Sequence, residues 1–236
     1  MNENLKYYYD YTISPLGKLF YQSVWEQLPH IQNKKVLDFG SGFGFTSEYI
    51  SKNNEVVSIE KDQEIIEYAQ KGQYKQLKGD YDILKSLEPN SFDVIICHLV
   101  FEFIDDYSNI LKEFSRILKK DGFISIVRHN KQGRIIQALT LEEAYDEVSD
   151  LLDGKDSYSP TFGDIKYLKD ENILSNIKDF YVDSSYGVRV FASLQTNEMR
   201  EKDNWIESMM RVERKVYSLD EYKNISYFNH LILRSK

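Results

Sequence analysis

A glycine-rich turn after a buried strand is the first candidate for chemistry in this sequence. Val36 to Phe39 are apolar apart from one acid, and they run into a turn that contains Gly40, Gly42 and Gly44. Glycines allow the backbone of a turn to approach a ligand closely. In a doubly wound sheet, such a turn lies at the carboxyl end of the first strand, where nucleotide-like ligands bind. We therefore expect a ligand site at this turn.

The acid in that strand, Asp38, indicates which ligand the turn accepts. A dinucleotide-binding fingerprint, G-x-G-x-x-G, that starts at Gly40 requires glycine at position 45, and the chain has Phe45 there. A carboxylate two residues before Gly40 also repels a pyrophosphate, whereas it attracts a ligand that carries an ammonium or a sulfonium group. The pattern therefore favours a cationic nucleoside over NAD.

The pattern G-x-G-x-G preceded by Asp38 resembles motif I of the class I S-adenosylmethionine-dependent methyltransferases. The resemblance implies that Asp38 holds the methionine ammonium of that cofactor. It assigns Glu60, at the end of the second strand, to the ribose hydroxyls, and Asp80 with the amide of Tyr81 to the adenine edge. The resemblance also implies that His98, at the end of the fourth strand, borders the transferable methyl group. The predicted cofactor residues are Asp38, Gly40, Ser41, Gly42, Gly44, Glu60, Lys61, Asp80, Tyr81 and His98, and no metal ligand is expected.

Most of these assignments have a structural alternative. Glu60 could be a solvated strand end, and Asp82 could replace Asp80. A lone histidine such as His98 is often a packed, hydrogen-bonded side chain instead of a catalytic one. The single cysteine, Cys97, is expected to be an inert buried thiol.

Further segments resemble the bacterial tRNA 5-carboxymethoxyuridine methyltransferases. They are Leu16 to Leu19 with Val24 to Leu28, Cys97 to Glu102, Gly187 to Phe191, and Tyr222 to Leu231. This resemblance implies esterification of a carboxylate on a wobble uridine of tRNA. An ionised carboxylate is already nucleophilic, so the transfer needs alignment and desolvation instead of a base. Arg189 is the candidate that grips the carboxylate, since a guanidinium binds it bidentately, and the alternative is a surface strand arginine. The predicted catalytic residues are His98 and Arg189.

The chain departs from this second family in two ways. Its net charge of −8 means that a tRNA partner needs a local basic patch. Candidate phosphate contacts are Arg128, Lys131, Arg134, Arg200, Lys202, Arg211, Arg214 and Lys215, which could equally form solvated faces balanced by nearby acids. Phe20 also stands where the family offers an arginine to the cofactor carboxylate, so Lys18 or a backbone amide must supply that contact.

Two other functions are compatible with the same motifs. The first is a small-molecule O- or N-methyltransferase whose cleft, rich in the chain's 18 Tyr and 13 Phe, takes an apolar acceptor. The second is a module that binds an adenosine ligand without catalysis.

The elements that position these residues alternate between strands and helices. The expected strands are Val36 to Phe39, Glu55 to Glu60, Lys75 to Lys78, Phe92 to His98 and Phe123 to Arg128. The clearest helix runs from Tyr107 to Leu118, followed by Lys119, Lys120 and a terminating Gly122. Later strand patterns at Phe180 to Ala192 and Ile225 to Leu233 complete the set.

This order predicts a seven-stranded, doubly wound α/β sheet of Rossmann-like type. It is mostly parallel with an antiparallel last strand and carries helices on both faces. We expect one methyltransferase domain over residues 1–236. It has an N-terminal cap helix within 1–34, read at Leu19 to Leu28, and an insertion or lid over 131–178. That insertion reads as a helix at Leu139 to Leu152, a loop at Asp153 to Gly163 and a helix at Ile165 to Ile177, and a later helix spans Glu198 to Tyr217.

Composition is consistent with this interpretation. Of the 236 residues, 42% are hydrophobic and 29% charged, as in ordinary globular proteins. A single cysteine excludes an intramolecular disulfide and points to a reducing cytoplasm. The N-terminal stretch has no signal-peptide pattern and no segment reads as a membrane span, so we expect neither export nor membrane insertion.

Overall fold

The computed structural model describes all 236 residues, which divide into two compact units. Unit 1 comprises Met1–Gln27, Arg128–Tyr167 and Ser185–His230, and unit 2 comprises Leu28–Val127, Leu168–Ser184 and Leu231–Lys236. Several unit boundaries fall within strands β5 (Leu118–His129), β8 (Phe180–Val188) and β9 (Phe228–Ser235). The prediction of a single domain is not tested by this division and stays a prediction.

The main sheet has seven strands in the order β3-β2-β1-β4-β5-β9-β8. The remaining strands are β1 (Lys35–Phe39), β2 (Glu55–Glu60), β3 (Lys75–Lys78) and β4 (Phe92–His98). β1 pairs in parallel with both β2 and β4, so the strand order reverses at β1. β2 with β3 and β4 with β5 are also parallel, and the last strand, β9, is antiparallel. The predicted mostly parallel, Rossmann-like sheet is therefore confirmed.

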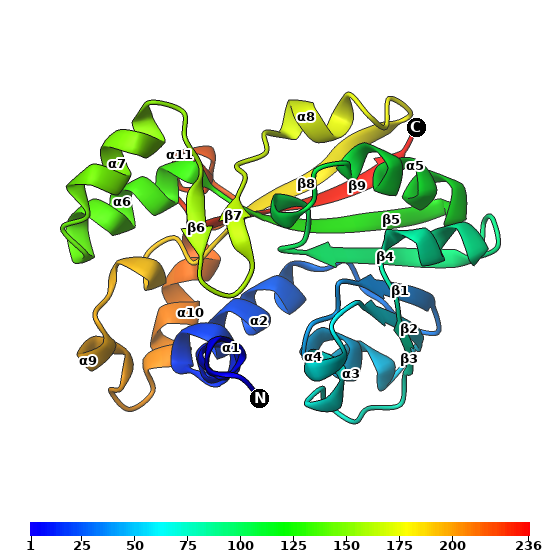
Figure 1. Ribbon diagram of the computed structural model, residues 1–236, viewed down its shortest axis with the longest axis horizontal. Helices are drawn as coiled ribbons and strands as arrows, with labels where there is room; N and C mark the ends of the chain where they lie inside the picture. The colour runs from blue at the N-terminus through cyan, green and yellow to red at the C-terminus, as the bar shows by residue number, and fades with distance from the viewer. The chain divides into compact units, whose positions relative to one another are not determined.

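Unit 2 has its core around the strands that carry apolar runs. Figure 1 shows α3 (Phe45–Ser51) and α4 (Gln63–Glu67) beside strands β1 to β3. α5 (Tyr107–Ile117) buries a stripe of Ile110, Leu111, Phe114 and Ile117 at the 3.6-residue period, and these side chains join the strand residues in one cluster. Each such side chain contributes about 1.5–3 kcal/mol through burial.

The predicted helix end at Gly122 is wrong. α5 ends at Ile117, and β5 begins directly at Leu118, so Gly122 lies inside a strand. The pairing of β4 with β5 shifts register next to this point. A Cβ on Gly122 would lie 2.7 Å from the carbonyl oxygen of Asp93. The glycine is therefore needed for a close approach of two backbones and not to end a helix.

Unit 1 begins with two helices, α1 (Glu3–Ile13) and α2 (Pro15–Gln27). α2 is the predicted cap helix, but it starts earlier than expected because Pro15 is suited to a first helical position. α1 was not among the expected elements. Leu16 and Leu19 of α2 share a buried cluster with Trp205, Met209 and Met210 of α10 (Trp205–Val216).

The predicted insertion over 131–178 contains helices and a small hairpin. Its elements are α6 (Lys131–Leu141), α7 (Tyr145–Leu152), β6 (Ser157–Ser159), β7 (Gly163–Ile165) and α8 (Asp170–Leu174). The expected loop at 153–163 thus holds one strand and the start of another, antiparallel one, and the expected helix at 165–177 is reduced to α8. The late helix predicted at 198–217 is divided into α9 (Asn197–Arg200) and α10.

Short helical turns complete the chain. They are η1 (Tyr81–Ser86), η2 (Phe101–Phe103), η3 (Ala192–Leu194) and α11 (Asp220–Lys223). None of the helices in the structure is long and apolar enough to cross a bilayer.

Candidate functional site

The glycine turn connects β1 to α3 at the carboxyl end of β1. Gly40, Gly42 and Gly44 have φ of 71°, 54° and 73°, in the left-handed region that favours glycine. The backbone N–H groups of Gly40 and Ser41 donate to the carbonyl of Ile59 at 2.9 and 3.0 Å, which ties the turn to β2. A Cβ on Gly40 would lie 2.4 Å from the side chain of Val100. The sequence predicted this turn, and its backbone geometry requires glycine.

Asp38 lies beneath the turn and is 4% exposed. The hydroxyl of Ser47, on α3, donates to its Oδ2 at 2.5 Å, and Ser47 in turn shares a hydrogen bond of 2.5 Å with Ser58 on β2. Burial raises the pKa of Asp38 to about 6, the Ser47 hydrogen bond opposes the rise, and the nearby charge of Glu60 adds to it. No lysine, arginine or histidine side chain forms an ion pair with this carboxylate.

Glu60, at the end of β2, is also buried, with 8% of its surface exposed. Its carboxylate accepts backbone N–H bonds from Gly42 at 3.0 Å, Lys61 at 2.8 Å and Asp62 at 2.9 Å. These bonds fix the carboxylate against the glycine turn. The alternative of a solvated strand end is therefore wrong for Glu60.

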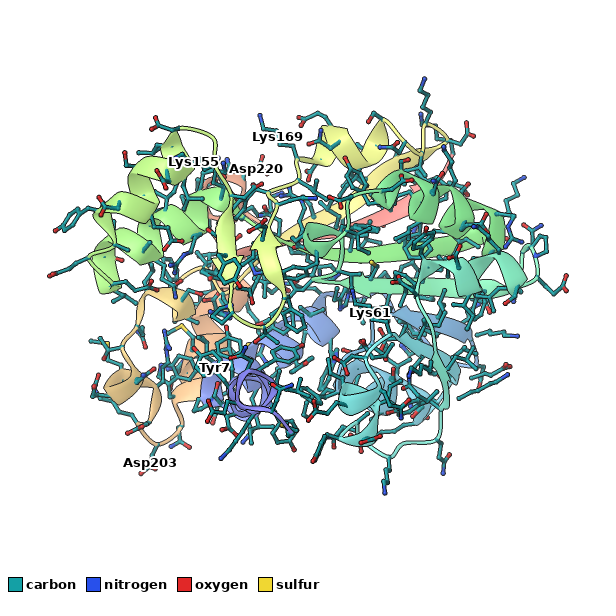
Figure 2. All side chains as sticks on the ribbon, in the orientation of Figure 1. Tyr7, Lys61, Lys155, Lys169, Asp203 and Asp220 are labelled. Atoms are coloured by element: carbon teal, nitrogen blue, oxygen red, sulfur yellow. The ribbon has the colours of Figure 1, made fainter.

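The residues expected at the adenine edge lie on an exposed turn after β3. Asp80 accepts a hydrogen bond from the N–H of Tyr81 at 2.7 Å and caps η1. The N–H of Gly79 donates to the carbonyl of Glu60 at 3.0 Å, which links the ends of β2 and β3. Asp82 is instead engaged by Lys85 at 2.7 Å. Lys61 is exposed (Figure 2).

His98 ends β4 and is half buried. Its Nε2 lies 2.7 Å from the hydroxyl of Ser125 on the neighbouring strand β5. The next residue, Leu99, has a left-handed backbone with φ of 57°. This is the hydrogen-bonded arrangement of a packed histidine, at the strand end where the sequence placed it. Its predicted catalytic role stays a prediction.

Arg189 belongs to unit 1, directly after β8, and is 1% exposed. The alternative of a surface strand arginine is therefore wrong. Its Nε donates to the hydroxyl of Ser193 at 3.0 Å, and its Nη1 donates to the hydroxyl of Tyr11. Its guanidinium lies 4.7 Å from the ring centroid of Tyr227 and 5.0 Å from that of Phe228. No carboxylate pairs with it.

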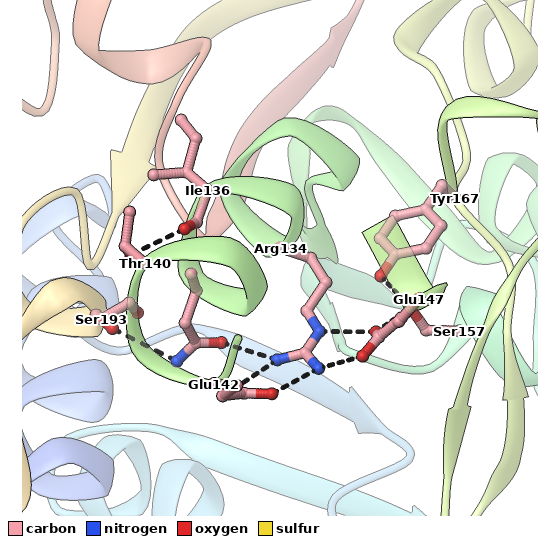
Figure 3. A network of polar contacts seen from close by, with 9 residues as sticks. Arg134, Ile136, Thr140, Glu142, Glu147, Ser157, Tyr167 and Ser193 are labelled. Atoms are coloured by element: carbon pink, nitrogen blue, oxygen red, sulfur yellow. Dashed lines mark hydrogen bonds and ion pairs between the residues drawn. The ribbon is translucent and has the colours of Figure 1, made fainter. Parts of the chain in front are cut away.

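Several basic residues predicted to contact tRNA are engaged within the protein. Arg134 is held between Glu142 at 2.7 Å and Glu147 at 2.5 Å, in the polar network of Figure 3. Arg214 pairs with Glu26 at 2.6 Å. Lys131 donates to two backbone carbonyls. Lys202, Arg211 and Lys215 remain exposed.

Sequence reasoning missed three polar residues that organise these clusters. Ser47 and Ser58 extend the hydrogen bonding of Asp38, and both are fully buried. Glu213, 2% exposed on α10, accepts N–H bonds from Val190, Phe191 and Ala192. The available signal for Glu213 was its position four and three residues after Met209 and Met210, on the apolar stripe of α10.

Comparison with known proteins adds a decisive observation to this geometry. A protein-family profile described as "Methyltransferase domain" matches residues 37–126, which contain the glycine turn, Asp38, Glu60 and His98. Residues 37–126 therefore resemble a methyltransferase domain. No group of three or more His, Cys, Asp or Glu side chains in the structure could hold a metal ion.

Curated relatives match a stretch of similar length. A ubiquinone biosynthesis O-methyltransferase of Pelagibacter ubique is 33% identical over 106 residues, which are 43% of this chain and 44% of the relative. An uncharacterised methyltransferase of Bacillus subtilis is 28% identical over 102 residues, which are 40% of each chain. The chain thus spans less than half the length of the curated relatives it matches.

Solved structures extend the likeness of the methyltransferase fold to the whole chain. An S-adenosylmethionine-dependent methyltransferase of Thermotoga maritima, described as a possible histamine N-methyltransferase, has a TM-score of 0.66 at 18% identity and covers 98% of this chain and 95% of its own. One from Archaeoglobus fulgidus has a TM-score of 0.62 at 17% identity and covers 98% and 100%. These structures confirm the predicted fold. The match of residues 37–126 to the methyltransferase profile supports the predicted methyltransferase and its cofactor, S-adenosylmethionine, for that part of the chain.

Proposed function

We propose that this protein transfers the methyl group of S-adenosylmethionine to a carboxylate oxygen of its acceptor, so that the product is a methyl ester. The observation that carries the cofactor part is the pair of buried acids, Asp38 and Glu60, which lie against a left-handed glycine turn with no cation between them. A diphosphate would be repelled there, whereas an ammonium or a sulfonium stabilises both carboxylates.

An unpartnered atom in the turn supports the fit of this cofactor. The hydroxyl of Ser41 is buried and has no hydrogen-bond partner in the protein, although buried polar atoms are normally paired. We assign Asp38 to the ammonium, Glu60 to the ribose hydroxyls, and Asp80 with Tyr81 to the adenine. Gly40, Ser41, Gly42, Gly44 and Lys61 supply the surrounding backbone.

The cofactor, when bound, supplies an electrophilic methyl group on a cationic sulfur. The protein's own task is then to hold the acceptor oxygen in line with that methyl group and to exclude water. A carboxylate acceptor needs no base, so the hydrogen-bonded state of His98 is compatible with a role in positioning. Arg189 is the residue that we propose to bind the acceptor's carboxylate.

Two acceptors meet this description, and each has support. A small organic acid is favoured by the similarity to O-methyltransferases of ubiquinone biosynthesis, which act on small molecules, and by the internal ion pairs of Arg134 and Arg214. The wobble uridine carboxylate of tRNA is favoured by the sequence resemblance of Gly187 to Phe191 and by the burial of Arg189. We place the reaction in the cytoplasm, where a buried free thiol such as Cys97 stays reduced.

An assay that follows the methyl group tests the proposal and separates the two acceptors. Purified protein is incubated with S-adenosylmethionine that carries a labelled methyl group and with an extract of cells that lack the protein. The extract is then divided into tRNA and small molecules. We expect base-labile label in a small-molecule acid, as a methyl ester releases methanol. Label in tRNA would select the uridine instead, and no label in either fraction would contradict the proposed activity.

A further inference from the structure

Arg189 is a charged side chain with unused binding capacity in the interior of unit 1. A guanidinium has five N–H donors, and the structure uses two of its nitrogens, toward Ser193 and Tyr11. The aromatic rings of Tyr227 and Phe228 also lie within cation–π distance of its guanidinium. Buried charges are normally paired with an opposite charge. The missing partner of Arg189 is therefore an anion that the protein does not supply.

A second arginine without a carboxylate partner lies beside the same loop. Arg200 donates from Nη1 to Asn197 at 3.1 Å and reaches the carbonyl of Ala192 at 3.5 Å, while its buried Nε has no partner. Ala192 is the neighbour of Ser193, which Arg189 contacts. Burial, followed by the charge of Arg189, lowers the pKa of Arg200, so the two cations oppose each other in the protein alone.

The phenol of Tyr11 completes the cluster. Its oxygen accepts the hydrogen bond from Arg189, which leaves its O–H to donate to another group. Tyr11 also lies within cation–π distance of Arg189, with 5.8 Å between the guanidinium carbon and the ring centroid. We call Arg189, Arg200 and Tyr11 the arginine cluster. All three side chains offer hydrogen-bond donors, and none of them carries a negative charge.

The backbone at Arg189 is strained, and hydrogen bonds from the adjacent loop hold it in place. Arg189 has a left-handed conformation with φ of 59°, which costs a bulky residue about 1 kcal/mol or more. The buried carboxylate of Glu213 stabilises this loop because it accepts N–H bonds from Val190, Phe191 and Ala192 at 2.9 to 3.1 Å. A strained residue that its surroundings fix so firmly is typical of a binding site.

A surface hollow gives access to Arg200. It has a volume of about 550 Å³, and its lining includes Arg200, Trp205 and Arg214. That volume suits a small organic ligand. Three exposed acids, Glu201, Asp203 and Glu207, also line the hollow, and Asp203 is labelled in Figure 2. Lys202 lines it as well, so the three acids balance the three cations of the lining and leave no net positive charge to attract a polyanion.

We infer that the arginine cluster is a carboxylate-binding site in which Arg189 and Arg200 together bind one small organic acid and Tyr11 donates a third hydrogen bond. Two guanidiniums match the two oxygens of a carboxylate, and the neighbouring rings of Tyr227 and Phe228 match an aromatic or other planar acid. The inference rests on the proposed function only in taking this acid to be the methyl acceptor.

Calorimetry with sodium benzoate as the probe tests the inference on the full chain. We expect benzoate to bind, while its neutral analogue, benzyl alcohol, does not. Arg200→Gln should weaken benzoate binding about tenfold, the usual effect of losing one charge-assisted hydrogen bond. The matched control is Arg211→Gln, an exposed arginine on α10 outside the cluster, and it should leave the affinity unchanged.

Arg189→Gln should abolish benzoate binding, and its thermal unfolding is recorded to show that it folds. If Arg189→Gln does not fold, Arg200→Gln alone tests whether the arginine cluster binds benzoate. S-adenosylhomocysteine is titrated into each sample as a separate readout of the cofactor site. Absence of benzoate binding in a wild-type protein that binds S-adenosylhomocysteine would overturn this inference and leave the proposed methyltransferase standing. Tighter binding of phenyl phosphate than of benzoate, or equal losses in Arg200→Gln and Arg211→Gln, would also overturn it.

Discussion

At the scale of single residues, Asp38 dominates the electrostatics of the proposed cofactor site. It is a buried carboxylate whose hydrogen bond to Ser47 does not offset the cost of removing its charge from water. Its pKa is raised from 3.8 to about 6, so a bound cation would stabilise the charged form of this carboxylate. The same property makes Asp38 a source of instability in the empty protein.

The effect of Asp38 on stability has a definite direction with pH. The folded state holds the Asp38 proton more tightly than the unfolded chain, because the pKa of about 6 exceeds the ordinary value of 3.8. The free energy of unfolding therefore falls as pH rises through this window, and the loss is complete above it. Asp38→Asn keeps an acceptor for Ser47 without the charge. We expect it to stabilise the ligand-free protein at pH 7 by up to about 3 kcal/mol.

Chemical denaturation at pH 4 and at pH 7 measures this effect. The gain from Asp38→Asn should be present at pH 7 and largely absent at pH 4. A variant that is equally stabilised or destabilised at both pH values would show that the Asp38 carboxylate is not the titrating group. Asp203→Asn, an exposed acid in unit 1, serves as the matched control.

The residue motifs of the cofactor site could be predicted because they are local in sequence. Asp38 and its glycines lie within seven positions, so their spacing alone identifies the turn. Ser47 and Glu213 could not be predicted in the same way. Each acts on a segment that only the folded chain brings near, Ser47 on the preceding strand and Glu213 on residues more than 20 positions earlier.

At the scale of elements, the long regular strands and helices agree with the sequence pattern, whereas short or interrupted ones do not. β2 and β4 have the predicted bounds, because continuous apolar or β-branched runs define buried parallel strands. β3 also has the predicted bounds, although Leu77 is its single apolar residue. α1 is rich in tyrosine, which blurs the contrast between its faces. β6 and β7 have three residues each, too few to show a period. The helix predicted at 139–152 is interrupted, because α6 ends at Leu141, α7 begins at Tyr145, and Glu143 between them has a φ of 51°.

The turn between β1 and α3 yields a prediction with a control that has similar backbone geometry. Gly40 and Gly154 both have positive φ, but a Cβ on Gly40 meets Val100 whereas a Cβ on Gly154 meets nothing within 4 Å. Gly154→Ala should cost about 1–2 kcal/mol from the backbone conformation alone. Gly40→Ala should cost a further 1–3 kcal/mol or so from crowding and weaken cofactor binding.

Urea denaturation and calorimetry with S-adenosylhomocysteine compare these two alanine variants. We expect Gly154→Ala to keep the wild-type affinity for S-adenosylhomocysteine, since Gly154 belongs to unit 1 and the cofactor residues belong to unit 2. Equal destabilisation by both substitutions, or unchanged affinity in Gly40→Ala, would contradict the close approach that the structure shows at the turn.

At the scale of the whole molecule, the net charge bears on the class of acceptor, and the division into units separates the predicted site residues. A net charge of −8 and the internal pairing of Arg134 and Arg214 leave little positive surface for a nucleic acid. All predicted cofactor residues lie in unit 2, whereas Arg189 and Arg200 lie in unit 1. The sequence could predict the glycine turn and its neighbouring acids but not this division. The division depends on which segments pack together, and unit 1 is assembled from three stretches far apart in the chain.

The central claim is that buried acids select a cationic nucleoside. The most direct test is calorimetric titration of S-adenosylmethionine into the wild type and Asp38→Asn at about pH 7.5, with Asp203→Asn as the control. We expect the wild type and Asp203→Asn to bind equally and Asp38→Asn to bind about 10- to 100-fold more weakly, with no binding of NAD to any of them. No binding of S-adenosylmethionine to the wild type, equal binding to Asp38→Asn, or tighter binding of NAD would contradict the account.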